Sequence, residues 1–159
     1  MLIEAMQTGI IEKTPEGEVY MSEKNKALIR RFHDEVINKG NLELIDDLCA
    51  PSLVDHAAPQ GSPSGTEGVK QMISMFRAAF PDVNSTVEDL IAEGDKVVAR
   101  FTFRGTHKGE FMGIAPTGVQ IEVTGIEINR IVAGKCVEHW ENFDMLGMMQ
   151  QLGVVPRPG

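Results

Sequence analysis

Four acidic residues and a histidine lie close together in "GIEINRIVAGKCVEHWENFD", residues 125–144. The alternation of this stretch predicts a two-stranded hairpin, and it carries Glu127, His139 and Glu141. Carboxyl and imidazole groups are the side chains that most often take and return protons in catalysis. Two arrangements fit the pattern: the groups alternate outward into water, or they line a cavity and transfer a proton there.

The turn of the predicted hairpin decides which of these groups share a face. If "VAG" forms a three-residue loop with Gly134 in the left-handed bulge position, Ile131 pairs with Lys135. A two-residue turn would shift the register by one and move Glu127 to the other face. Such a turn needs positive φ at Ala133, which alanine disfavours. The sequence therefore favours the three-residue loop.

In this register Glu127 lies opposite His139, with Glu141 on the diagonal of the same face. Two carboxyls close together in an apolar cavity cannot both ionise at low cost, so one pKa rises and the pair shares a proton. We expect Glu141 to be the principal general base and acid, tuned by Glu127 and His139. The alternative is that Glu141 points into solvent and that Glu127 and His139 form a structural cross-strand pair.

Further residues are candidates for contact with a ligand at the mouth or roof of such a cavity. One histidine follows the short extended segment "LVDH", and another begins the loop "KGEFMGIAPTG", whose apolar residues could form a roof. The predicted ligand-binding residues are His56, His107, Phe111, Met112, Ile114 and Phe143. Their ordinary alternatives are loop hydrogen bonds for the two histidines and core packing for the apolar side chains.

The sequence lacks the spacing of a metal site, with no HExxH and no histidine pair two or four residues apart. It also lacks the G-x-S-x-G pattern of a serine nucleophile. Cys49 and Cys136 are too few for a disulfide scaffold, so we expect both to be reduced and buried. We predict no metal and no cofactor.

The composition is that of one soluble globular domain: 159 residues, 42% hydrophobic and 24% charged. A net charge of −8 repels phosphate backbones, which argues against nucleic-acid binding. No apolar run approaches the roughly 18 residues of a membrane span. The N-terminal residues lack the basic and apolar regions of a signal peptide, so we expect a cytoplasmic protein.

The hydrophobic period changes from helical to alternating near Asp82. Helical spacing predicts three helices, from Ser22 to Gly40, over Leu42–Cys49 and from about Thr66 to Ala79. Four long strands then form a meander, and a short helix, "MLGMMQQLG", ends it. This order predicts an α+β fold. Residues 1–21 read as an extension, either disordered or a hairpin of Ile10–Ile11 with Val19–Met21, before a domain over 22–159.

Six motifs in this order resemble the SnoaL-like polyketide cyclase (ester cyclase) family of the nuclear transport factor two-like superfamily. They are "LVDH", "AAFPD", "GDKVVARFTFRGTHKGEFMGIAPTG", "GIEINRI", "GKCVEHW" and "QQLG". The match extends from Ser22 to Gly153. The superfamily hosts several unrelated reactions, so the resemblance is more specific for family than for reaction.

The resemblance implies a cone-shaped, curved antiparallel sheet packed against three N-terminal helices and enclosing an apolar pocket. It also implies a histidine and an aspartate, on the last two strands, that handle a proton during an intramolecular aldol ring closure. These positions fall on Glu127 and Glu141. Glu141 keeps a carboxylate, whereas Glu127 replaces the imidazole with a second one.

Two functions follow as expectations. The first is a cofactor-independent enzyme that binds an apolar, carbonyl-bearing small molecule and catalyses proton transfer of the aldol cyclisation or isomerisation type. The alternative is a non-catalytic, small-molecule-binding dimerisation module. Convergence of Glu127 and Glu141 inside an enclosed apolar cavity would favour the enzyme. In both cases we expect a homodimer through the sheet face that carries Trp140, Ile126, Ile128 and Val132.

Overall fold

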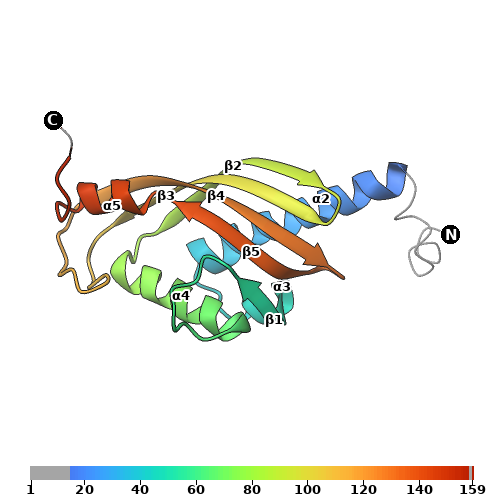
Figure 1. Ribbon diagram of the computed structural model, residues 1–159, viewed down its shortest axis with the longest axis horizontal. Coiled ribbons are helices and arrows are strands. Elements are labelled where there is room, and N and C mark those ends of the chain that lie inside the picture. Colours follow the sequence, from blue (N-terminus) through green and yellow to red (C-terminus); the bar gives the residue numbers. More distant parts are fainter. Residues whose placement is uncertain (1–14, 158) are drawn as a thin grey trace.

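The computed structural model describes residues 15–157 and 159, which form an α+β fold. Its helices are α2 (Pro15–Arg31), the π-helix η2 (Phe32–Asn38), α3 (Leu44–Leu48), α4 (Gly65–Ala79) and α5 (Met145–Gln151). Its strands are β1 (Cys49–Asp55), β2 (Asn84–Glu93), β3 (Lys96–Thr106), β4 (Gln120–Val132) and β5 (Lys135–Phe143). Figure 1 shows α2 crossing one side of the long curved sheet and α4 lying beside β1.

The five strands lie in the order β1-β5-β4-β3-β2. Strands β2 to β5 form the predicted antiparallel meander, and β1 joins its edge by pairing in parallel with β5. The predicted fold class, a curved and mostly antiparallel sheet packed against helices, is confirmed. The parallel edge strand brings the end of β1 beside the middle of β5, where the hairpin carries its acidic residues and histidine.

The inner face of the sheet follows the period of two. Strand β3 buries alternate side chains from Val97 to Phe103, and β4 does so from Ile121 to Ile131. Glu127 and Asn129 take two of these inward positions on β4. At a third, Gly125 leaves room for the ring of Phe101, which a Cβ atom would meet. On β3 and β4 the inner face is therefore apolar except at this polar pair.

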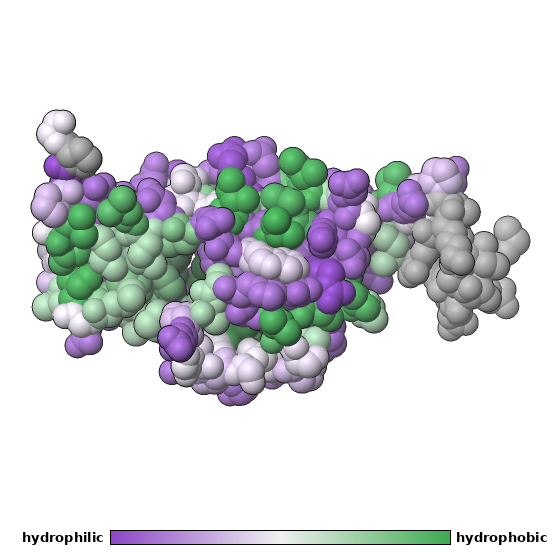
Figure 2. All heavy atoms as spheres, viewed as in Figure 1, coloured by the Kyte–Doolittle hydropathy of each residue, from purple (hydrophilic) through white to green (hydrophobic). Residues whose placement is uncertain are grey.

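Aromatic rings fill the interior at the end of the sheet that α5 covers. Phe80 and Phe103 pack edge to face, with ring centroids 5.9 Å apart, and Phe111 is fully buried beside them. Asp144 begins α5 by accepting a hydrogen bond from the Gly147 backbone N–H. Figure 2 shows an apolar area at this end of the molecule and, over the strands, apolar side chains interspersed with hydrophilic ones.

The N-terminal helix begins earlier than the sequence predicted. Because α2 begins at Pro15, Val19–Met21 is helical and the strand predicted there is wrong. Acidic residues in the first turn of α2 interact favourably with the positive end of the helix dipole. The predicted domain boundary at Ser22 falls inside this helix. The other predicted strand, Ile10–Ile11, lies outside the described residues.

Candidate active site

The hairpin between β4 and β5 has a two-residue turn. Ala133 and Gly134 have φ angles of 50° and 74°, and Val132 pairs with Lys135. The predicted three-residue loop is therefore wrong, because this chain accepts positive φ at an alanine. A β-bulge at Val137 then shifts the pairing by one further residue, which returns Glu127 to the same face as His139 and Glu141.

The bulge sets the candidate acid–base residues on one face. Glu127 pairs directly with Glu141, and Asn129 pairs with His139. The predicted common face of Glu127, His139 and Glu141 is thus confirmed, although the residue opposite Glu127 is Glu141 and not His139. A direct cross-strand pair brings two carboxyl groups closer than the predicted diagonal would.

This face forms one wall of a cavity of about 590 Å³. Glu127, His139 and Glu141 all line it. The rest of the lining is mainly apolar, and its aromatic and methionine residues are Phe32, Phe76, Phe101, Phe103, Phe111, Phe143, Met72, Met75, Met112 and Met145. An apolar cavity with a few convergent polar groups is the usual form of a small-molecule site.

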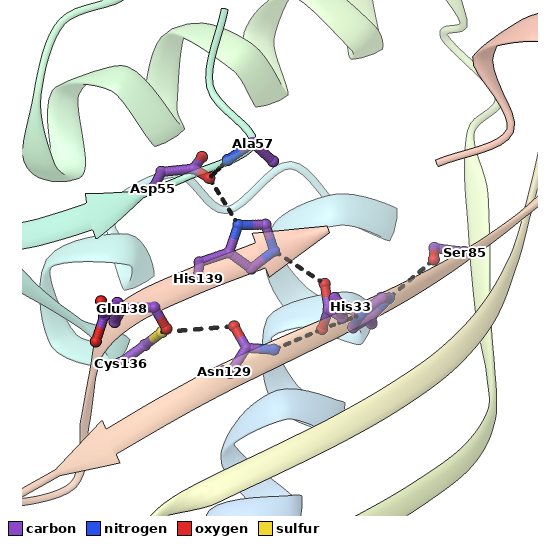
Figure 3. A network of polar contacts seen from close by, with 9 residues as sticks. His33, Asp55, Ala57, Ser85, Asn129, Cys136, Glu138 and His139 are labelled. Carbon is purple, nitrogen blue, oxygen red and sulfur yellow. Dashed lines mark hydrogen bonds and ion pairs between the residues drawn. The ribbon is translucent and has the colours of Figure 1, made fainter. Parts of the chain in front are cut away.

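His139 lies between two carboxylates. Its Nδ1 is 2.9 Å from Asp55 Oδ1, and its Nε2 is 3.4 Å from Glu127 Oε2. Ionised carboxylates only accept hydrogen bonds, so both ring nitrogens must carry hydrogen. Burial lowers the pKa of His139, but the two carboxylates outweigh it and raise the pKa to about 10. Figure 3 shows the ring of His139 turned toward Asp55 of β1. His139 is therefore a cation at neutral pH.

Glu127 is held as an anion by three donors. His139 donates to Oε2, while His33 Nε2, at 3.3 Å, and Asn129 Nδ2, at 2.9 Å, donate to Oε1. Burial would raise the pKa of Glu127, but the hydrogen bonds and charges of the two histidines outweigh it and hold the pKa far below its ordinary value. For the same reason His139 keeps the pKa of Asp55 low against the effect of burial.

The surroundings of Glu141 differ from those of Glu127, the residue opposite it. The half-buried carboxyl of Glu141 makes no hydrogen bond or ion pair with any residue that the structure describes. Burial raises the pKa of Glu141 to about 7; the His139 cation opposes this rise, and the negative charges of Glu127 and Asp55 add to it. A carboxyl that titrates near neutral pH can take a proton in one step and return it in the next.

Three of the predicted ligand contacts do not line the cavity: His56, Ile114 and His107. His56 stacks on Trp140, with ring centroids 4.8 Å apart, and pairs with Glu138 at 2.9 Å. Both partners alternate away from the cavity along β5, so His56 lies on the outer side of the sheet. Ile114 forms an isolated bridge with Phe111 and does not line the cavity.

His107 also lies away from the cavity, because it ties together the base of its loop. Its ring is fully buried, and its Nδ1 accepts a hydrogen bond from the Thr117 N–H at 3.2 Å. Its Nε2 has no hydrogen-bond partner among the described residues. The loop hydrogen bond considered as the alternative is the one observed. The remaining predicted ligand contacts, Phe111, Met112 and Phe143, do line the cavity.

The prediction missed three members of the polar network: His33, Asp55 and Ser85. His33 lies four residues after Ile29, so it continues a helical stripe whose other members are buried. Asp55 lies two residues after the buried Leu53 on β1, and alternation therefore turns it inward where the neighbouring His56 turns outward. Both periodic signals were present in the sequence.

The described residues provide neither a reactive thiolate nor a metal site. Burial raises the pKa of the Cys49 and Cys136 thiols to about 12, so neither is a thiolate nucleophile at neutral pH. Within residues 15–157 and 159, no group of three or more histidine, cysteine or acidic residues is placed to hold a metal ion. No helix in the same part of the chain has the length and apolarity to cross a membrane.

The fold and the sequence match one family of known proteins. The sequence model of the SnoaL-like polyketide cyclase family matches residues 27–152, which include all five strands. The chain belongs to this family. It is 29% identical to the nogalonic acid methyl ester cyclase of Streptomyces nogalater, over 73% of this chain and 88% of that one. It is 28% identical to the aklanonic acid methyl ester cyclase of Streptomyces peucetius, over 86% and 84%.

Solved structures of other proteins share the SnoaL-like fold of this chain. TsrD from Streptomyces laurentii superposes with a TM-score of 0.78 at 31% identity, over 84% of this chain and 97% of that one. IdmH from Streptomyces antibioticus superposes with a TM-score of 0.72 at 38% identity, over 82% and 99%.

Proposed function

We propose that this SnoaL-like protein binds an apolar, carbonyl-bearing small molecule in its cavity and catalyses an intramolecular aldol ring closure by proton transfer. The proposal rests chiefly on Glu141, a carboxyl that titrates near neutral pH and faces the cavity beside the fixed anion Glu127. The two relatives named above as methyl ester cyclases indicate the class of substrate, an ester that closes a ring.

The reaction would begin when the ionised Glu141 takes a proton from a carbon next to a carbonyl group. The electron pair left on that carbon attacks a second carbonyl carbon of the same molecule and forms a carbon–carbon bond. The electrons of the second C=O bond move to its oxygen, which becomes an alkoxide. The carboxylic acid of Glu141 then returns the proton to this oxygen, so the enzyme and the composition of the substrate are unchanged.

The other residues of the cavity have supporting roles. The negative charges of Glu127 and Asp55 make Glu141 a stronger base, while the His139 cation keeps Glu127 from taking the proton itself. The aromatic and methionine walls suit a flat, largely apolar ligand, because methionine adapts to irregular shapes and aromatic rings stack. Phe111, Met112 and Phe143 are the proposed contacts among the residues predicted from the sequence.

The test is incubation of the protein with the methyl esters of nogalonic and aklanonic acid. An aldol ring closure conserves composition, so the product should have the mass of its substrate and a different chromatographic retention. The rate without protein is the control. Binding of either ester without conversion would indicate the non-catalytic alternative, and conversion no faster than the control would contradict the proposed activity for these substrates.

We also expect two copies to pair through the outer face of the sheet. Ile126 and Ile128 are 51% and 36% exposed on this face, next to Trp140, and burying them would remove apolar surface from water. The wild-type protein should sediment at about twice the 17.4 kDa of one chain. Ile128→Glu should shift it to monomer, whereas Val154→Glu, at a position 49% exposed near the C-terminus, should not. A wild-type monomer at micromolar concentration would contradict this expectation.

A further inference from the structure

His33 is a buried imidazole on η2 that contacts Glu127, although it lies outside the hairpin of β4 and β5. Its ring is 1% exposed and packs against Phe101, with ring centroids 5.2 Å apart. Nδ1 is 2.8 Å from Ser85 Oγ on β2, and Nε2 is 3.3 Å from Glu127 Oε1 on β4. The proposed proton transfer so far assigns His33 no part of its own.

The backbone around His33 is unusual. The helix changes from α to π at Phe32, and π segments occur frequently at functional sites. The far end of η2 is tied to the same serine that contacts His33: Asn38 Oδ1 accepts from the Ser85 N–H at 2.6 Å, and Asn38 Nδ2 donates to the Ser85 carbonyl at 3.0 Å. Figure 3 shows His33 beside Ser85. The chain therefore holds this imidazole at both of its nitrogens.

The direction of each hydrogen bond follows from Glu127. An ionised carboxylate only accepts, so Nε2 of His33 must carry the hydrogen that Glu127 receives. If the ring is neutral, Nδ1 accepts the hydroxyl hydrogen of Ser85; if it is charged, Nδ1 donates to Ser85 Oγ. In both forms the N–H group that faces Glu127 is kept. The contact between His33 and Glu127 thus persists in either protonation state of the imidazole.

We propose that His33 is a positioning residue that, with His139 and Asn129, fixes the Glu127 carboxylate as an anion in the cavity wall, so that Glu141 alone exchanges the proton. This proposal rests on the proposed function. Without His33, Oε1 of Glu127 would keep only the neutral amide of Asn129 as a donor. Glu127 and Glu141 would then compete for one proton, as closely spaced carboxyls do.

Several titratable groups face this pair from the surrounding elements. They are His33 on η2, Asp55 and Cys49 on β1, and Cys136 and His139 on β5. The two thiols stay protonated near neutral pH, and His139 stays charged. Of the donors that hold Glu127, His33 comes from a helix, so it can be changed while the hairpin stays intact.

Two substitutions separate positioning from other roles. In His33→Gln the amide nitrogen can take the place of Nε2 and donate to Glu127, whereas its oxygen can accept from Ser85; this side chain does not titrate. His33→Leu replaces the imidazole by an apolar side chain of similar size and removes the donor. A positioning role requires Gln to preserve function and Leu to lose it. A role in packing alone would favour Leu, and proton transfer by His33 itself would be lost in both variants.

The first measurement needs no substrate. Carboxyl ¹³C NMR of protein labelled at glutamate, assigned with Glu127→Gln and Glu141→Gln, follows both groups from about pH 4 to about pH 9. In the wild type and in His33→Gln, Glu141 should titrate near neutral pH and Glu127 should not titrate. In folded His33→Leu, Glu127 should begin to titrate and the Glu141 midpoint should fall, because its neighbour is no longer a fixed anion. Unchanged titrations in His33→Leu would overturn the proposal, as would loss of the wild-type pattern in His33→Gln.

The second measurement is turnover of the methyl ester substrates. His33→Leu should lower kcat by about ten-fold or more with little change in KM, and His33→Gln should restore most of it. If the titrations change as expected while wild-type protein converts no ester, the positioning role stands and the proposed reaction is wrong. If turnover is found and His33→Leu retains it with wild-type titrations, the reaction stands and the role of His33 is wrong.

Discussion

Glu141→Gln is expected to lower kcat for the methyl ester substrates by about 10²–10⁴, the usual contribution of a positioned general acid–base group. The amide has nearly the shape of the carboxyl and can neither take nor return a proton near neutral pH. Substrate affinity should change little, because the apolar walls that hold the ligand are untouched. Steady-state kinetics of the purified variant measures both quantities.

A matched control is available on the outer face of the sheet. Glu122, on β4, pairs with Arg104 at 2.7 Å, and its side chain is 65% exposed. Glu122→Gln makes the same chemical change away from the cavity and should retain wild-type kcat. If Glu141→Gln keeps most of its activity, Glu141 is not the group that moves the proton. If both variants lose activity equally, the loss cannot be assigned to the position of Glu141 in the cavity.

The same substitution should stabilise the fold at neutral and alkaline pH. The pKa of Glu141 is raised from 4.5 to about 7 by burial, so the folded state binds a proton that the unfolded chain releases between these values. Below about pH 4.5 both states are protonated and the carboxyl costs nothing; above about pH 7 the folded protein must bury a poorly solvated charge. This difference in pKa between the folded and unfolded states corresponds to about 3 kcal/mol of unfolding free energy, lost above about pH 7.

Glu141→Gln removes that cost and leaves Asp55, Glu127 and His139 in place. The amide has no hydrogen-bond partner among the described residues of the cavity, so its lost hydration offsets part of this gain. We therefore expect the unfolding free energy to rise by about 1–3 kcal/mol at pH 8 and hardly at all at pH 4.5. Urea denaturation of wild type and variant at the two pH values measures the difference. Equal stability of the two proteins at pH 8 would mean that Glu141 ionises as easily in the folded as in the unfolded chain.

The sequence predicted the strands of the site better than their register. The alternation in β5 placed His139 and Glu141 on one face, but the side of β4 that faces them depends on the register. Glu127 shares their face because two departures from the predicted hairpin, the two-residue turn and the bulge, compensate each other. The turn was wrong because the preference against positive φ at Ala133 is a small energy, which the packing of two long strands overrides. The compensating bulge at Val137 has no local sequence signal, so the direct pairing of Glu127 with Glu141 could not be read from the residues.

The polar network was harder to predict because its members come from distant segments. His33, Asp55 and Glu127 are brought together only when η2 packs on the sheet and β1 adds to its edge. The sequence could suggest that two carboxyls share a proton, but not which of them would be ionised. That choice depends on the donors around each group: Glu127 has three, and Glu141 has none among the described residues.

The pH dependence of kcat/KM tests the central role of Glu141 most directly, because it reports the ionisation of essential groups in the free enzyme. A general base with the pKa of Glu141 should give an activity that rises with pH through a midpoint of about 7. The residual activity of Glu141→Gln should lack this ionisation, while Glu122→Gln should keep it. A wild-type profile without an ionisation near neutral pH, or one that persists unchanged in Glu141→Gln, would contradict the assignment of Glu141 as the proton-transferring residue.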